Sequence, residues 1–176
     1  MRVATIALAV LTLLTACDTT GGSVPRSSTP AANATSTALL PTEVSALPSM
    51  DFDAYEQLLY QLRGTPVVVN LWASWCGPCA KESAALVEAA RRYGHEVQFV
   101  GVDVRDERAD AGDFLARYHV PYPSVFDPSG DVHDRLGFVG LPDTIFYAAD
   151  GTIADTWSGP IDGETLGRTI NRLVTA

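Results

Sequence analysis

The sequence is poor in basic residues. It has 12 lysines and arginines against 21 aspartates and glutamates, which gives a formal net charge of -9 at pH 7 and a pI near 4.6. Binding of nucleic-acid phosphates needs clustered positive side chains, and this chain does not have them. The charge therefore excludes a nucleic-acid partner, and attachment to an anionic membrane surface would have to come from apolar groups.

Cysteine and histidine are also scarce, with three of each. A structural zinc site needs four ligands, yet there is one Cys-x-x-Cys pair, and His95, His119 and His133 show no paired ligand spacing. A c-type haem site needs a histidine after the second cysteine of the pair, where Ala80 stands. We expect no metal and no other cofactor, and we expect the three histidines to be surface or loop groups.

No apolar run is long enough to cross a bilayer, which takes about 20 residues. The run Val3–Leu14 follows a single arginine and has the shape of a cleaved signal peptide over residues 1–16. It ends in Leu-Thr-Ala-Cys, which resembles the bacterial lipobox. We therefore expect Cys17 to be acylated and to anchor the mature protein, rather than to be an incidental cysteine after an ordinary signal.

Residues 17–47 are expected to form the lipidated cysteine and a flexible linker. Thr, Ser, Ala, Gly and Pro dominate this segment, and it shows no apolar periodicity. A chain of this kind has an r.m.s. reach of about 30 Å, enough to clear the lipid headgroups. One folded domain over residues 48–176 is then expected, because the remaining length suits a single core.

The rest of the chain alternates between helical and strand patterns. The run Val67–Leu71 is apolar and largely β-branched without alternation, which predicts a central strand covered on both faces. Asp150-Gly151 between two short strands predicts a hairpin. Together these patterns predict an α/β domain with a central mixed sheet flanked by helices and a C-terminal hairpin and helix. Helices are expected near 52–62, 81–93, 106–118, 132–136 and 162–174, and strands near 67–71, 97–102, 124–126, 144–147 and 153–157.

The motif Cys76-Gly77-Pro78-Cys79 lies between a predicted buried strand and a predicted helix. Unpaired N–H groups and the helix dipole stabilise a thiolate at a helix N-terminus, so we expect Cys76 to be the exposed attacking nucleophile. Cys79, one turn further on, can then resolve a mixed disulfide. Pro78 has its φ preset for the first helical turn. The motif predicts redox exchange.

Three other interpretations of the cysteine pair were weighed. The pair could be a structural disulfide, although short loops at helix starts rarely serve as staples. A peroxidase is a second possible enzyme, but peroxiredoxins carry Thr three residues before the reactive cysteine, where Ala73 stands. A lipid-anchored binding module with incidental cysteines is the third.

Several segments in order resemble the membrane-anchored thioredoxin-like thiol-disulfide oxidoreductases of TlpA and ResA type, here in a lipoprotein form. The resemblance covers Phe52 to the C-terminus. The segments that carry it are Asn-Leu-Trp-Ala-Ser-Trp-Cys-Gly-Pro-Cys over 70–79, Glu82, Val-Gly-Val over 100–102 and Gly-Leu-Pro-Asp-Thr over 140–144.

The resemblance implies a thioredoxin fold in which Pro142 is a cis-proline facing the cysteines. It implies a substrate groove formed by Trp75, Gly77, Pro78, Leu141 and Pro142. It also implies thiol or disulfide partner proteins outside the membrane, apocytochrome c among them, a membrane-bound redox partner, and a place on the extracytoplasmic face of the bacterial cell membrane. Reduction of partners, oxidation of partners and cytochrome c maturation all stay open as directions of exchange.

Glu82 is expected to share a helix face with Cys79, at a position where the resembled family carries an acid. Thioredoxin instead has a strand acid where this chain has Asn70. Glu82 is therefore expected to accept the proton of Cys79, and the alternative is a solvated glutamate paired with Lys81.

The sequence departs from the family at two positions. Ala84 replaces a usual helix proline, which puts a kink there in doubt. Asp143 follows the proline where Thr or Ser is common. It could lie near Cys76 and disfavour the thiolate, or point to solvent.

Overall fold

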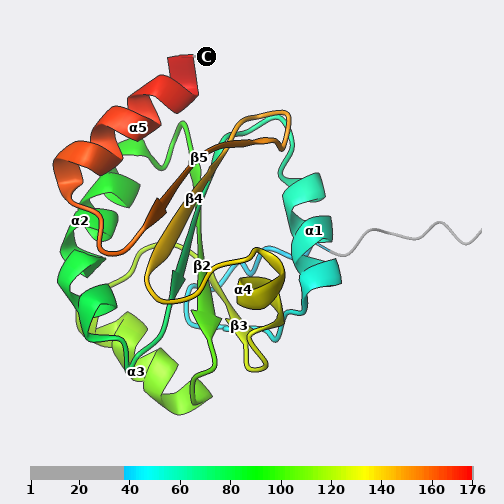
Figure 1. The fold of residues 1–176 in the computed structure, drawn as a ribbon, viewed down its shortest axis with the longest axis vertical. Helices are drawn as coiled ribbons and strands as arrows, with labels where there is room; N and C mark the ends of the chain where they lie inside the picture. The colour runs from blue at the N-terminus through cyan, green and yellow to red at the C-terminus, as the bar shows by residue number, and fades with distance from the viewer. Residues whose placement is uncertain (1–37, 176) are drawn as a thin grey trace, which may run out of the picture. The chain divides into compact units, whose positions relative to one another are not determined.

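The structure is a computed structural model, and it describes residues 38–175. These residues form a central five-stranded sheet with helices on both faces (Figure 1). The predicted signal peptide and Cys17 lie outside the described residues. In chain order the elements are α1 (Phe52–Gln61), β1 (Val67–Trp72), α2 (Gly77–Tyr93), β2 (Gln98–Val104), α3 (Arg108–Tyr118), β3 (Ser124–Asp127), α4 (Asp131–Arg135), β4 (Asp143–Tyr147), β5 (Ile153–Ser158) and α5 (Gly163–Thr175).

Strand β1 is the middle of the sheet, whose order is β3-β2-β1-β4-β5. It pairs in parallel with β2 and antiparallel with β4, and all six of its residues are buried. Burial on both faces explains why its sequence is a continuous apolar run with a single polar residue, Asn70. The predicted central strand is confirmed, and its carboxyl end leads directly to the cysteine motif.

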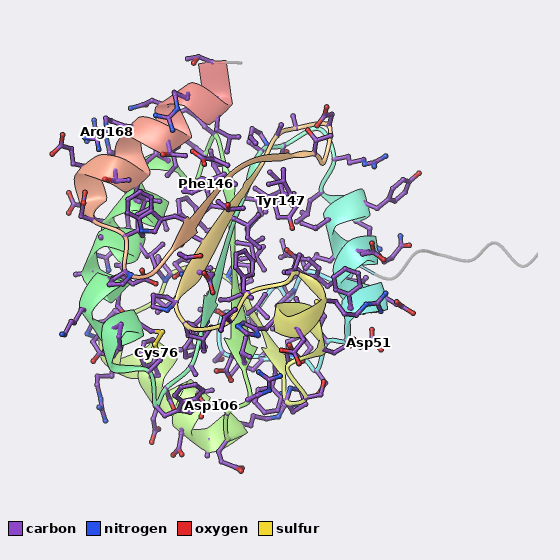
Figure 2. The ribbon with its side chains drawn as sticks, in the orientation of Figure 1. Asp51, Cys76, Asp106, Phe146, Tyr147 and Arg168 are labelled. Atoms are coloured by element: carbon purple, nitrogen blue, oxygen red, sulfur yellow. A yellow bond between two sulfur atoms is a disulfide. The ribbon has the colours of Figure 1, made fainter. Side chains whose placement is uncertain are left out.

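Two apolar cores cover the two faces of the sheet. Helices α2, α3 and α5 pack on one face, where Leu86, Phe114 and Leu166 meet side chains of β1 and β4. Helices α1 and α4 cover the other face (Figure 1). There the hydroxyls of Tyr55 and Tyr147 lie 2.8 Å apart and join α1 to β4, with Tyr147 labelled in Figure 2. The predicted α/β class with a mixed sheet is confirmed.

The C-terminal hairpin forms as predicted, with β4 and β5 antiparallel around Asp150-Gly151. Gly151 has φ +86°, in the left-handed region that glycine adopts without a Cβ penalty. Strand β5 lies at the sheet edge, and each of its residues is exposed. The following helix α5 buries Leu166, Ile170 and Leu173.

The packed part of the chain starts earlier than residue 48. Leu47 is 2% exposed, and its carbonyl accepts a hydrogen bond from the Arg108 guanidinium. The backbone N–H of Leu39 donates to the side chain of Gln61 at 3.0 Å. The last residues of the expected linker therefore belong to the folded unit. No helix within residues 38–175 is both long and apolar enough to cross a membrane.

Candidate active site

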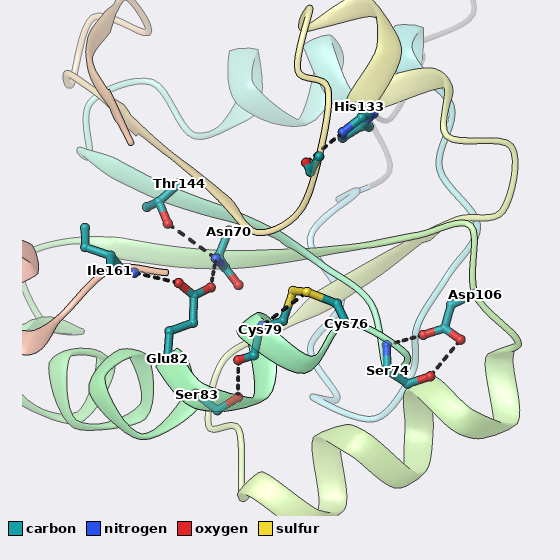
Figure 3. Close-up of a disulfide and its surroundings, with 11 residues drawn as sticks. Asn70, Ser74, Cys76, Cys79, Glu82, Ser83, Asp106, His133, Thr144 and Ile161 are labelled. Atoms are coloured by element: carbon teal, nitrogen blue, oxygen red, sulfur yellow. Dashed lines mark hydrogen bonds between the residues drawn. A yellow bond between two sulfur atoms is a disulfide. The ribbon is translucent and has the colours of Figure 1, made fainter. Parts of the chain in front are cut away.

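Helix α2 begins inside the cysteine motif, at Gly77 rather than at the expected Lys81 (Figure 3). Cys76 is the N-cap residue, with extended backbone angles, and its sulfur accepts a hydrogen bond from the Cys79 N–H at 3.1 Å. Pro78 sits in the first turn, where a missing N–H removes no helical bond. The helix then runs without interruption through Ala84. The N-terminal end of α2 is thus built around the Cys76 sulfur.

The two cysteines form a disulfide with their Cα atoms 5.2 Å apart. Cys76 was expected to be exposed, but it is 4% exposed, and Cys79 is 2% exposed. The two differ in access rather than in burial, because Cys76 lines an open cavity of about 430 Å³ and Cys79 does not. A partner sulfur can therefore approach Cys76 through this cavity.

The cavity has one wall from the motif and one from the segment before β4. Trp75 on the motif side is 62% exposed, and its indole N–H donates to the Arg105 carbonyl at 3.0 Å. The Leu141–Pro142 peptide bond is cis, as the resemblance implied. The predicted groove residues Trp75, Gly77, Pro78 and Leu141 line this cavity, and Pro142 lines the neighbouring cavity of about 280 Å³.

Glu82 is buried, 2% exposed, so the alternative of a solvated glutamate paired with Lys81 is wrong. One carboxylate oxygen accepts from the Asn70 amide at 2.8 Å, and the other accepts from the Ile161 N–H at 2.9 Å (Figure 3). Burial raises the pKa of Glu82 to about 7, although these two hydrogen bonds oppose the shift. Near neutral pH this carboxyl group can therefore both bind and release a proton.

Asn70 holds Glu82 in place from strand β1. Its amide nitrogen also lies 3.3 Å from the Thr144 hydroxyl on β4. Asn70 occupies the strand position at which thioredoxin has an acidic residue. The acid is supplied here from α2, and the strand residue contributes a neutral donor that orients it.

The segment just before the motif is anchored by Asp106, a residue that the sequence analysis assigned only to a helix start. Its carboxylate accepts from both the N–H and the hydroxyl of Ser74, the latter at 2.8 Å. Helix α3 begins at Arg108 rather than at Asp106, with Glu107 as its N-cap residue. Near it lies Asp103, which is fully buried. Burial and the neighbouring Asp106 raise the pKa of Asp103 to about 9, so Asp103 is neutral at pH 7.

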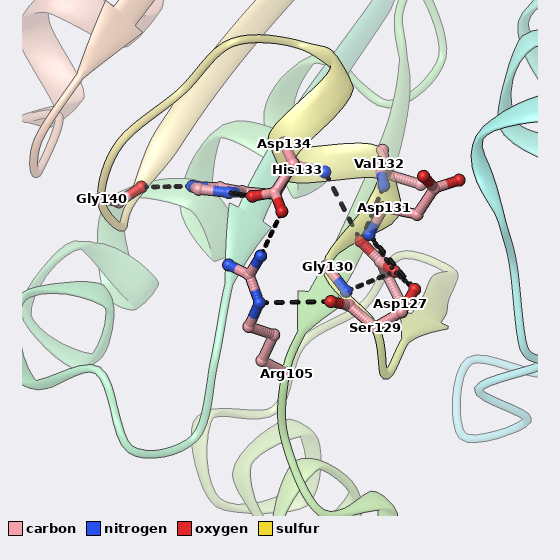
Figure 4. A network of polar contacts seen from close by, with 9 residues as sticks. All are labelled: Arg105, Asp127, Ser129, Gly130, Asp131, Val132, His133, Asp134 and Gly140. Carbon is pink, nitrogen blue, oxygen red and sulfur yellow. Dashed lines mark hydrogen bonds and ion pairs between the residues drawn. The ribbon is translucent and has the colours of Figure 1, made fainter.

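The expectation of three surface or loop histidines is wrong for His133, which lies on α4 and is 4% exposed. Its ring contacts the Asp134 carboxylate and the Gly140 carbonyl (Figure 4), and it lines the Cys76 cavity. The surrounding sequence is polar and α4 is five residues long, so no periodicity marks the histidine as buried. Only the fold brings it to the cavity.

Asp143 does not point to solvent, because it is 2% exposed. Burial raises its pKa, opposed by the hydroxyl of Ser158 and the positive charge of His133. One of its carboxylate oxygens has no hydrogen-bond partner. Within the described part of the chain, no three His, Cys, Asp or Glu side chains converge to form a metal site.

A helix-capping disulfide beside a cis-proline, on a mixed sheet flanked by helices, defines a thioredoxin-fold protein with a dithiol–disulfide centre. The chain belongs to the AhpC/TSA family, which it matches over residues 43–156. The expected thioredoxin fold is therefore confirmed, and so is the kinship with thiol-disulfide oxidoreductases of ResA type.

The chain is also similar to individual thiol-disulfide exchange proteins, both in sequence and in structure. The chain is 37% identical over 114 residues to the thiol:disulfide interchange protein DsbE of Allochromatium vinosum. The matched region covers 64% of this chain and 62% of that protein. It is 23% identical over 124 residues to the thiol-disulfide oxidoreductase ResA of Bacillus thuringiensis, covering 70% and 72%. A DsbF homologue from Corynebacterium diphtheriae superposes with a TM-score of 0.60 at 31% identity, covering 65% and 76%. The chain thus spans less than two thirds of the first of these relatives.

The raised pKa of Glu82 predicts a pH-dependent contribution to stability. The unfolded state loses this proton near 4.5 and the folded state near 7, so the folded state binds more protons between these values. The free energy of unfolding should therefore fall, by about 3 kcal/mol at most, as pH rises through this window.

Urea unfolding of the oxidised protein, wild type against Glu82→Gln, measures this effect. The difference in the free energy of unfolding between wild type and variant isolates the contribution of Glu82, because Asp103 titrates in both proteins. Asn70 can rotate its amide so that its oxygen faces the new Gln amide, which should keep the variant folded. A difference that does not change between pH 4.5 and 7 would contradict the assignment.

Proposed function

We propose that the protein is an extracytoplasmic thiol-disulfide oxidoreductase that exchanges disulfides with protein thiols through Cys76 and Cys79. The observation that carries this proposal is the arrangement of the pair. The two sulfurs are bonded at the start of α2, and only Cys76 lines the open cavity. A structural disulfide would have no need of a cavity at one sulfur.

In the reducing direction, the Cys76 thiolate attacks one sulfur of a partner disulfide. The partner S–S bond breaks, a mixed disulfide forms with Cys76, and one partner sulfur leaves as a thiolate that takes a proton from solvent. Cys79 then loses its proton, attacks the Cys76 sulfur, and releases the second partner sulfur. Two electrons pass from the dithiol to the partner, and the Cys76–Cys79 disulfide remains. Oxidation of a partner dithiol is the reverse sequence.

Glu82 is proposed as the base that takes the proton of Cys79. It lies three residues further along α2, on the same helix face. Its pKa of about 7 suits a group that accepts a proton near neutral pH and later returns it. Both oxygens already accept one hydrogen bond, which fixes the carboxyl group without using all of its lone pairs.

The partner is proposed to be a protein with an accessible cysteine pair outside the cell membrane. The family resemblance makes apocytochrome c a candidate, and a membrane-bound redox protein would return the centre to its working state. The net direction of exchange depends on the reduction potential of the Cys76–Cys79 couple relative to its compartment. Equilibration of the couple with glutathione buffers measures that potential.

Peroxide reduction is the competing activity, and peroxiredoxins carry Thr three residues before the reactive cysteine. Ala73, three residues before Cys76, is fully buried and offers no hydroxyl for a peroxide. A resolving cysteine stands one helical turn away, which suits exchange with another disulfide. We therefore favour disulfide exchange, and we expect hydrogen peroxide to be consumed no faster than by a free thiol.

The first test is the assignment of the nucleophile. Cys76→Ser should abolish insulin reduction with dithiothreitol as the electron donor, because no thiolate then faces the cavity. Cys79→Ser should instead trap mixed disulfides through Cys76, seen by mass spectrometry. Iodoacetamide at mildly acid pH should label Cys76 of the reduced wild type first. Preferential labelling of Cys79 would reverse the two roles.

Glu82→Gln should slow the release of the reduced partner while leaving Cys76 alkylation nearly unchanged. The reason is that Cys79 would have no carboxylate to accept its proton, a loss expected to be on the order of 10²-fold in the resolving step. Single-turnover exchange followed across pH is the measurement, with the exposed Glu88→Gln of the same helix as control. Resolution at the wild-type rate at every pH would exclude the base role.

Cys17 is proposed as the lipid anchor, with residues 1–16 removed as a signal peptide. Expressed in a bacterium, the full chain should be found in the membrane fraction, and Cys17→Ala should leave it, because the acidic domain has no charge attraction to anionic lipids. Retention of the variant in membranes would show that the apolar N-terminal run itself anchors the protein.

A further inference from the structure

The ring of His133 faces a hydrogen-bond acceptor at each of its nitrogens (Figure 4). Nδ1 lies 3.1 Å from a carboxylate oxygen of Asp134, and Nε2 lies 3.0 Å from the carbonyl oxygen of Gly140. Neither partner has a proton to donate. The Gly140 partner is a carbonyl oxygen, and hydrogen bonds from Arg105 and His133 hold the pKa of Asp134 below its usual value. A neutral imidazole has one N–H and satisfies one of the two. The imidazolium satisfies both.

One of the two contacts, from Nε2 to the Gly140 carbonyl, joins helix α4 to a wall of the active-site cavity, whereas Asp134 belongs to α4 itself. Helix α4 is held to β3 by Asp127, whose buried carboxylate accepts from the N–H groups of Gly130 at 2.9 Å and Val132 at 3.0 Å. On the other side, Gly140 directly precedes the cis Leu141–Pro142 bond. His133, Gly140 and Leu141 all line the cavity that Cys76 lines. The histidine therefore ties this wall to a rigid part of the fold.

Charged groups from α4, β4, β3 and the end of β2 lie near His133. Asp134 comes from the same helix, and Asp143 faces it from β4, where the positive charge of His133 lowers the Asp143 pKa against the effect of burial. From β3, Asp127 accepts the His133 backbone N–H at 3.5 Å. Arg105, after β2, is the one cation in the group, and it is paired with Asp134 and with the Ser129 carbonyl.

We propose that His133 is a positioning residue for the exchange reaction, whose imidazolium holds the Gly140–Pro142 wall in place for the partner chain. When the ring loses a proton to solvent, the remaining N–H stays on Nδ1 against the carboxylate, which is the stronger acceptor, and Nε2 no longer donates to the Gly140 carbonyl. The wall then loosens, and partner binding weakens as pH rises. This inference rests on the proposed exchange function. It adds a determinant of partner affinity that is separate from the cysteines and from Glu82.

The test compares KM and kcat for insulin, with dithiothreitol as donor, from about pH 5.5 to about 8.5, the range in which histidine changes charge. In the wild type, KM should rise with pH while kcat follows the thiol chemistry. His133→Phe should raise KM about fivefold at the acid end, as expected for loss of the one hydrogen bond that reaches the wall, to the Gly140 carbonyl, and should abolish the rise. His133→Gln keeps a neutral donor for the Gly140 carbonyl, so its KM should be intermediate and also independent of pH.

Two controls separate positioning from other effects. The His95→Gln variant removes a histidine that is 71% exposed, and it should keep the wild-type profile. The neutral small disulfide 4,4′-dithiodipyridine does not need the wall, so it should react with Cys76 at the same rate in every variant. In ¹⁵N spectra at pH 6, both ring nitrogens of His133 should be protonated.

The outcomes are distinguishable from failure of the proposed function. Absence of exchange with insulin in the wild type would overturn the function itself. With exchange intact, a wild-type KM profile in His133→Gln would overturn the inference, and so would an equal loss of rate with the small disulfide. A singly protonated ring at pH 6 would overturn it independently of activity, even if His133→Phe failed to fold.

Discussion

The burial of β1 on both faces is the constraint on which the site depends. A strand in the middle of the sheet has no solvent face, so its residues are apolar except for Asn70, which must be paired inside the protein. Glu82 of α2 supplies that pairing and is itself held by the Ile161 N–H. The same strand delivers the cysteines to the start of α2, so one buried element positions both the sulfurs and the carboxyl group beside them.

Most of the fold could be predicted from the sequence, because its elements carry strong local signals. Each local pattern was compatible with one kind of element. The apolar run indicated the buried strand β1, the Asp-Gly pair indicated the hairpin, and the pattern of apolar residues near the C-terminus indicated helix α5. The residue pattern placed the start of α2 at Lys81, four residues late, whereas the cysteine motif placed Cys76 at the helix N-terminus, where it is the N-cap and its sulfur accepts a bond that Ser or Asp normally accepts. The burial of Leu47 was not predicted, because its neighbours in the sequence are Pro, Ser and Ala. Its carbonyl is bound by Arg108, which lies far along the chain.

The site was predictable where chemistry lies within a motif and unpredictable where it depends on tertiary contacts. Cys76 and Cys79 are adjacent in sequence, and Glu82 follows them on one helix face. His133, Asp106 and the burial of Asp143 arise only when segments distant in sequence meet around the cavity. A lone histidine in a polar stretch gives no sign that both of its nitrogens will face acceptors.

The acids around the site carry less charge than their number implies. Burial raises the pKa of Asp103 to about 9 and that of Glu82 to about 7, because it penalises both carboxylates. In the proposed mechanism, a thiolate at Cys76 would disfavour a second negative charge on Glu82, so Glu82 would keep its proton longer in the reduced protein than in the oxidised one. Formation of the mixed disulfide removes the charge from Cys76. In the proposed mechanism, Glu82 therefore becomes easier to ionise at the step in which Cys79 needs a base.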